Sequence, residues 1–87
     1  MARALQAIFG EVIRSCRNER NMSQERLALE SDLQRSFISR LERGKAQPTL
    51  VTIFELAKAL DMEPVNIIAE VQKRWNNQKS RVATPIE

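Results

Sequence analysis

The chain contains no histidine and a single cysteine, Cys16, among its 87 residues. Histidine is the commonest general base and metal ligand, and one cysteine cannot form a cluster of thiolate ligands. We therefore expect no catalytic triad and no metal site within one chain. Cys16 falls at an inward position of an expected helix, where a free thiol behaves as a small apolar residue; a redox or metal role is the alternative.

Glycine is also scarce, with two residues in the whole chain. No segment resembles the glycine-rich loop with which many enzymes hold phosphate groups. Asp and Glu are scattered, whereas a nuclease would need acidic residues in pairs. We therefore expect no enzymatic activity and no cofactor, and the lack of an evident second domain argues against a small-molecule ligand.

Long apolar runs are missing as well, because no stretch reaches the roughly 18 apolar residues that a membrane span requires. The N-terminal segment contains Arg3, Glu11 and Arg14, unlike a secretory signal. Hydrophobic residues nevertheless make up 43% of the chain, enough for one folded domain. We expect a soluble, cytoplasmic protein with no membrane partner.

The most informative segment runs from Gln24 to Gly44, where the apolar residues fit two short helices joined by a tight turn. Ser23 can cap the first helix, and the small side chain of Ala28 gives the clearance that two crossing helices need. Ile38 and Leu41 form an inward stripe on the second helix and leave its polar and basic residues outside. This pattern predicts a helix-turn-helix, a motif that reads DNA.

Helical spacing of apolar residues predicts further helices over about 4–20, 50–60 and 64–75. Residues 76–87 are polar and without periodicity, so we expect a flexible tail there. The predicted fold class is all-α. We expect a compact five-helix DNA-binding domain over residues 1–75, with the helix-turn-helix at helices 2 and 3.

Four motifs, SQERLA, RSFISRLERGK, PTL and LAKAL, follow one another along the chain. In this order and at this spacing they resemble the helix-turn-helix family of lambda-type repressors and xenobiotic-response-element (XRE) regulators, over roughly residues 5–70. The Arg-Ser-Phe-Ile-Ser run is most similar to controller proteins of restriction-modification systems and to small phage or prophage regulators. The resemblance implies a lambda-repressor-like domain that binds double-stranded DNA and regulates transcription.

Positive charge is concentrated in the second helix of the motif and the loop after it. The formal net charge is +3, and the segment Arg35–Lys45 holds four basic residues against one acidic residue, Glu42. A basic stripe of this kind attracts phosphate groups and releases their counterions. A solvated helix face is the alternative interpretation.

The DNA major groove accepts an α-helix, and the N-terminal half of the recognition helix meets the bases. The candidate base contacts are Gln34, Arg35, Ser36, Ser39 and Arg40. Arg35 is the leading candidate, because its planar guanidinium can donate hydrogen bonds to guanine O6 and N7 together. Its alternative role is to bind a phosphate. Phe37 stays open between the core and a base or backbone contact, and the resemblance implies partial exposure there.

Other residues are expected to hold the DNA backbone or the fold. Arg43 and Lys45 follow the recognition helix and predict phosphate contacts. The resemblance implies that Gln24 grips a phosphate at the start of the preceding helix. It also implies a buried ion pair between Arg17 and Glu42, which would hold the first helix of the chain against the recognition helix.

Two residues depart from the family's pattern. Asp32 stands in the turn where glycine is preferred, but Asp visits the left-handed conformation at tolerable cost. Gln34 stands where Ser, Thr or Asp usually caps the recognition helix, and the missing cap costs about 0.5–2 kcal/mol. Gln34 is either kept free to meet DNA or simply tolerated.

The last expected helix carries an apolar stripe formed by Val65, Ile68, Val71 and Trp75. A small globule cannot easily bury a whole terminal helix, and Trp is enriched at interface centres, so we expect a homodimer. Packing of Val65 and Ile67 onto the chain's own core is the alternative. The predicted function is a homodimeric, sequence-specific transcriptional regulator on an inverted repeat; an antitoxin and a protein-binding adaptor are the alternatives.

Overall fold

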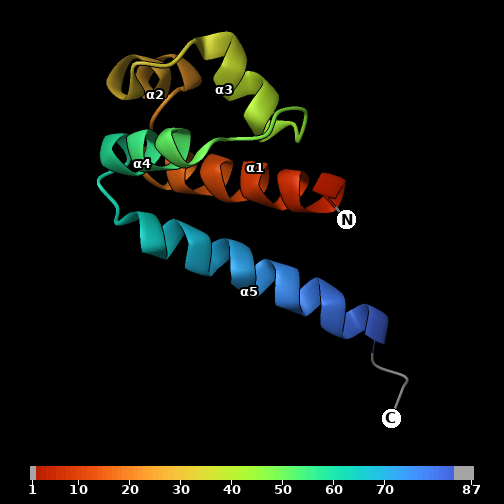
Figure 1. Ribbon diagram of the computed structural model, residues 1–87. Coiled ribbons are helices and arrows are strands. Elements are labelled where there is room, and N and C mark those ends of the chain that lie inside the picture. Colours follow the sequence, from red (N-terminus) through yellow and green to blue (C-terminus); the bar gives the residue numbers. More distant parts are fainter. Residues whose placement is uncertain (1, 84–87) are drawn as a thin grey trace.

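The computed structural model describes the backbone of residues 2–83 and the side chains of residues 4–78, which form five helices. The helices are α1 (Ala2–Glu19), α2 (Gln24–Ser31), α3 (Arg35–Glu42), α4 (Leu50–Ala59) and α5 (Pro64–Ala83). α1 and α4 form a middle layer, with α2 and α3 on one side and α5 on the other (Figure 1). The prediction of an all-α, five-helix fold is confirmed.

The boundaries of the helix-turn-helix have local causes. Arg26 N donates a hydrogen bond to Ser23 Oγ at 3.0 Å, which caps α2. Asp32 ends α2 in the left-handed conformation, with φ at 59°, and Leu33 N then donates to Ala28 O at 3.0 Å. The turn therefore forms with Asp in the place of glycine.

A residue in the left-handed conformation also follows the end of three other helices. Asn21, Gly44 and Asp61 follow α1, α3 and α4, and their φ angles of 53°, 73° and 57° all lie in the left-handed region. The residues after two of these stops, Met22 and Met62, pack against the core. Each turn thus fixes the direction in which the next helix leaves.

The core receives fully buried side chains from every helix. The large side chains with 0% exposure are Ile13, Leu27, Ile38, Leu41, Leu56, Leu60 and Ile67. Each side chain of this size stabilises the fold by about 1.5–3 kcal/mol when it is fully buried. Cys16 belongs to the same cluster at 6% exposure, as expected for a core residue.

The C-terminal helix is longer than the sequence predicted. We expected a helix over about 64–75 and a flexible tail over 76–87, but α5 continues to Ala83. Residues 76–83 contain neither glycine nor proline, and a helix that has already formed gains one hydrogen bond for each further residue. The helix therefore includes residues 76–83 of the expected tail, whose flexibility stays a prediction, and residues 84–87 lie outside the described part of the chain.

Candidate nucleic-acid interface

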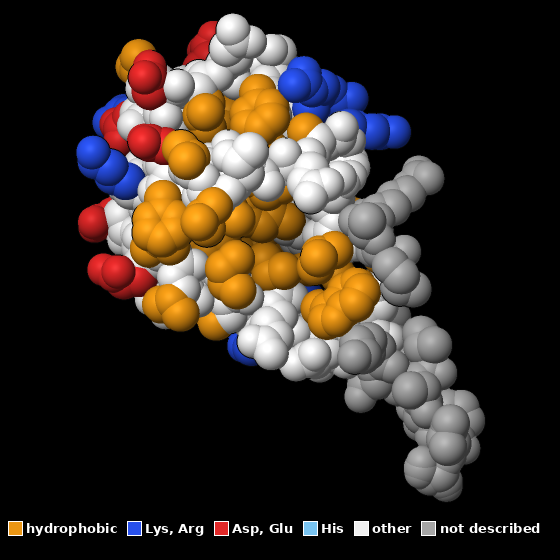
Figure 2. Space-filling view, viewed as in Figure 1, with side chains coloured by type: hydrophobic (Ala, Val, Ile, Leu, Met, Phe, Trp, Pro, Cys, Tyr) orange, Lys and Arg blue, Asp and Glu red, His pale blue; other side chains and the backbone are white. Residues whose placement is uncertain are grey.

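α3 divides its residues between the core and the solvent. Ile38 and Leu41 are completely buried, whereas Phe37 and Ser39 are half-buried. The exposed residues on this helix and beside it are Gln34, Arg35, Ser36, Arg40, Arg43 and Lys45. Lys and Arg side chains gather where α3 ends and its following loop begins, at the upper right of Figure 2.

The basic residues around α3 keep their positive charge unpaired within the described part of the chain. Ion pairs between described residues engage Arg17, Arg20, Arg26, Lys73 and Arg74. None of these pairs involves Arg35, Arg40, Arg43 or Lys45. Because no described carboxylate neutralises this group, its full charge is available to a phosphate backbone.

Two of these basic side chains are ordered by neighbours on α3. Arg40 Cζ lies over the ring of Phe37, 5.5 Å from its centroid, at a spacing of three residues. Arg43 Nε donates to Ser39 Oγ at 3.3 Å, at a spacing of four residues. The sequence leaves Phe37 open between the core and a DNA contact, and it makes Ser39 a candidate base contact, which stays a prediction. It did not predict that either residue contacts an arginine, although their helical spacing from the two arginines is visible in the sequence.

A buried ion pair ties α3 to α1, at the positions where the resemblance implied one. Arg17 Nε and Glu42 Oε2 lie 2.7 Å apart, and Arg17 Nη2 donates to Glu42 Oε1 at 2.9 Å. The side chains are only 11% and 3% exposed. Hydrogen bonding to Glu42 raises the pKa of Arg17 although burial opposes the charge, and Arg17 Nη1 also donates to Met22 O at 2.8 Å.

Gln24 joins this pair, which the sequence did not predict. Its Nε2 donates to Glu42 Oε1 at 3.0 Å, so the first residue of α2 is held directly against the last residue of α3. The spacing of 18 residues gives no helical signal for such a contact. The side-chain amide nitrogen of Gln24 carries two hydrogens, so one remains for another acceptor. The phosphate contact of Gln24 stays a prediction.

Gln34 is the N-cap residue of α3, and within the described residues its side chain makes no capping hydrogen bond. Its backbone is extended, with φ at −82° and ψ at 142°. The carboxamide is exposed at the N-terminal end of the recognition helix. This placement agrees with both earlier interpretations of Gln34, a residue free to meet DNA and a residue that is simply tolerated.

The predicted dimer stripe divides into exposed and buried members. Val65 and Ile68 are 68% and 43% exposed, and Trp75 is half-buried. Val71 is 7% exposed because it packs in the chain's own core, so it has almost no surface left for a partner. The alternative interpretation was right for Ile67, which is fully buried, and wrong for Val65.

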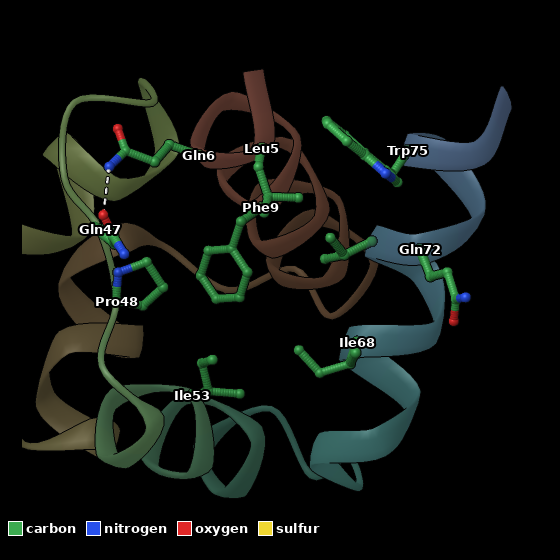
Figure 3. Close-up of a pocket in the computed structure, with 10 residues that line it drawn as sticks. Leu5, Gln6, Phe9, Gln47, Pro48, Ile53, Ile68, Gln72 and Trp75 are labelled. Atoms are coloured by element: carbon green, nitrogen blue, oxygen red, sulfur yellow. Dashed lines mark hydrogen bonds between the residues drawn. The ribbon is translucent and has the colours of Figure 1, made fainter. Parts of the chain in front are cut away.

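An apolar groove of about 510 Å³ lies between α1, α4, α5 and the loop before α4. Its apolar lining includes Leu5, Phe9, Pro48, Ile53, Ile68 and Trp75, which point into the space in Figure 3. Leu50 and Phe54, on the same helix as the groove residue Ile53, are 70% and 55% exposed. Hydrophobic side chains spread over this face in Figure 2. We call the groove together with Leu50, Phe54 and Val65 the apolar face.

Comparison with known proteins identifies the arrangement around α3. Residues 13–67 match the family profile described as helix-turn-helix. The control protein C.BamHI of Bacillus amyloliquefaciens is 39% identical over 69 residues, which cover 78% of this chain and 85% of that protein. The chain belongs to the XRE-type helix-turn-helix family.

Solved structures of this family share the fold. The restriction-modification controller protein C.AhdI from Aeromonas hydrophila is 42% identical, covers 74% of this chain and 97% of its own, and superposes with a TM-score of 0.72. The controller protein C.Esp1396I, solved as a tetramer in complex with its natural 35-base-pair operator, is 32% identical over 79% of this chain and 91% of its own, with a TM-score of 0.74. The predicted similarity to controller proteins is confirmed.

Membership of the XRE family settles the general role of the chain. It is a DNA-binding transcriptional regulator, and its relatives are regulators rather than enzymes. The matched residues 13–67 include the whole helix-turn-helix but end before Ile68 and Trp75. No helix within residues 2–83 is long and apolar enough to cross a membrane.

Proposed function

We propose that this regulator acts in the cytoplasm as a homodimer, binding an inverted-repeat operator with α3 in the major groove. The observation that carries the proposal is the exposed basic group Arg35, Arg40, Arg43 and Lys45, which forms no ion pair with described residues. Charges that are already neutralised within the fold would contribute little to phosphate binding, whereas these are available.

Arg35 is the proposed base reader. It is the first residue of α3, where the recognition helix of a helix-turn-helix approaches the bases. Its two-pronged donor set fits guanine O6 and N7. Gln34, Ser36 and Arg40 are proposed as further base contacts, and Gln24, Arg43 and Lys45 are proposed to hold phosphates on either side.

The network around Glu42 supports this orientation of α3. Glu42 accepts hydrogen bonds from Arg17 on α1 and from Gln24 on α2, so three helices are fixed to one carboxylate. Fixing the helix before binding reduces the ordering that DNA must impose. Arg17 and Glu42 therefore serve the fold, and Gln24 links the fold to the proposed phosphate contact.

The apolar face supports the homodimer. Leu50, Phe54, Val65 and Ile68 are each at least 43% exposed, and exposed apolar patches of this kind mark interaction sites. A two-fold dimer presents two α3 helices to an inverted repeat with half-sites about 34 Å apart. C.Esp1396I was solved as a tetramer on its operator, so binding of two dimers side by side is a further stoichiometry to measure.

DNA recognition is tested by selection from a randomised DNA pool at several salt concentrations, with wild type, Arg35→Ala and Lys73→Ala. We expect wild type to select a palindrome and Arg35→Ala to lose preference at one base pair of each half-site, by about 1–3 kcal/mol. Lys73→Ala removes a positive charge from α5, on the far side of α1 from α3 (Figure 1), and should keep the preference. If wild type selects no sequence, the apolar face becomes the place to look for a protein partner.

The homodimer is tested by sedimentation of wild type, Ile68→Asp and Asn66→Asp. A carboxylate at Ile68 would be buried in the proposed interface without a partner and should shift the protein to monomers. Asn66 is an exposed polar residue of the same helix and provides the matched control. If Ile68→Asp sediments as a dimer, as wild type does, the apolar face is not the dimer interface.

A further inference from the structure

Phe37 and Arg40 form a cation–π contact between the aromatic ring and the guanidinium. The Phe37 ring is half-buried and packs against the core, so one side of it is held in place by the fold. The exposed Arg40 guanidinium lies over it, with Cζ 5.5 Å from the ring centroid. The flexible arginine is thereby attached to a fixed aromatic surface.

This contact leaves the donors of Arg40 available. A guanidinium stacks through its flat face, whereas its five N–H donors point outward in its plane. A carboxylate partner would occupy those donors, but no ion pair with a described residue involves Arg40. Arg40 can therefore contact the ring and still bond a guanine edge or a phosphate.

Ordering the Arg40 side chain before binding reduces the conformational entropy that is lost when DNA fixes it. A free arginine loses much rotamer freedom when DNA fixes it, and a side chain that is already held loses less. Within the described residues Arg35 has neither an ion pair nor a ring contact, so the two arginines of α3 differ in this respect.

We propose that Phe37 is a positioning residue, whose ring holds the Arg40 guanidinium toward DNA and thereby sets how strongly the base pair facing Arg40 is discriminated. This inference rests on the proposed binding of α3 in the major groove. It assigns Phe37 an effect on specificity through Arg40 instead of a contact of its own with a base.

The first test uses the protein without DNA and so does not depend on the proposed function. Stacking on an aromatic face shifts the side-chain proton resonances of Arg40, which NMR can follow. We expect the shift in wild type and in Phe37→Tyr, and its loss in Phe37→Leu, which keeps an apolar side chain against the core. Arg40 resonances that are the same in wild type and Phe37→Leu would overturn the proposal, whatever the DNA results.

The second test is a double-mutant cycle on the selected operator and its single-base variants. Phe37→Leu and Arg40→Ala should both weaken discrimination at the same base pair, Phe37→Leu by about two- to fivefold. Phe37→Leu should have no further effect in the Arg40→Ala background, and Phe37→Tyr should retain the wild-type preference. Thermal unfolding of each variant shows whether the fold is retained.

The outcomes separate this inference from the proposed function. Independent effects of the two substitutions, or a loss of preference at different base pairs, would show that Phe37 meets DNA itself and would overturn the inference while the regulator function stands. Failure of wild type to select any sequence would overturn both. If Phe37→Leu unfolds, Phe37→Met provides a second ring-free variant with the same expected result.

Discussion

Gly10 on α1 lies against the backbone of Leu41 on α3, so close that a Cβ at Gly10 would be 2.1 Å from Leu41 O. Glycine in a helix is usually unfavourable, by about 1 kcal/mol relative to alanine. Its presence here permits the close approach of α1 to the recognition helix. The orientation of α3 therefore depends on the absence of one methyl group.

Gly10→Ala should destabilise the protein although alanine favours helix. The added Cβ meets a backbone atom that cannot rotate away, and overpacking costs about 1–3 kcal/mol. A clash with backbone belongs in the upper part of that range, so after the gain of about 1 kcal/mol in helix propensity urea unfolding should show a net loss of about 1–2 kcal/mol. Operator affinity should fall because α3 is displaced. Arg14→Ala, at an exposed position of the same helix, is the control. A Gly10→Ala variant with wild-type stability would mean that α1 and α3 separate without cost.

Glu42→Ala should be strongly destabilising. It leaves Arg17, whose side chain is 11% exposed, without its carboxylate, and an uncompensated buried charge costs about 3–5 kcal/mol. The double variant Arg17→Met with Glu42→Leu should lose less stability than Glu42→Ala, since no charge is then stranded. Chemical denaturation of the three proteins measures this. Equal losses for the single and double variants would argue that packing, rather than charge, is what matters there.

Gln34→Thr should raise the stability of the protein and lower its sequence preference. Threonine can supply the capping hydrogen bond that α3 lacks among the described residues, worth about 0.5–2 kcal/mol. Removal of the carboxamide should weaken discrimination at one base pair if Gln34 meets DNA as proposed. Thermal unfolding and operator selection test the two effects separately. Greater stability with unchanged preference would leave Gln34 as a tolerated residue.

The buried thiol of Cys16 should lower the free energy of unfolding at alkaline pH. Burial raises the pKa of its thiol above the ordinary value of 9.0. The folded state then holds the proton more tightly than the unfolded state, so this contribution is present below pH 9.0 and is lost as the pH rises through the folded pKa.

Urea unfolding between pH 7 and 10.5 should therefore show a steeper decline for wild type than for Cys16→Ala. Comparing the two proteins removes the titration of lysine, which both share. Alanine leaves a small cavity and lowers the free energy of unfolding at every pH. The test therefore compares how steeply this free energy falls with pH, not its absolute value. Parallel pH profiles would contradict the expected contribution of the thiol.

The sequence by itself determined the local elements. Ser23 and Asp32 specify the start and stop of α2 through interactions within a few residues, and the spacing of Ile38 and Leu41 fixes which side of α3 faces inward. Such signals do not depend on the rest of the molecule. This explains why the helix-turn-helix and the outward placement of Arg35 could be predicted.

The tertiary structure decided which neighbour covers each apolar residue. Val65 and Val71 lie on one predicted stripe, yet the fold buries only Val71, because periodicity gives a face and not its surroundings. The bond from Gln24 to Glu42 joins two helices across a turn and has no local signal. The length of α5 also escaped prediction, because a helix that has already formed can continue through polar residues without burying any of them.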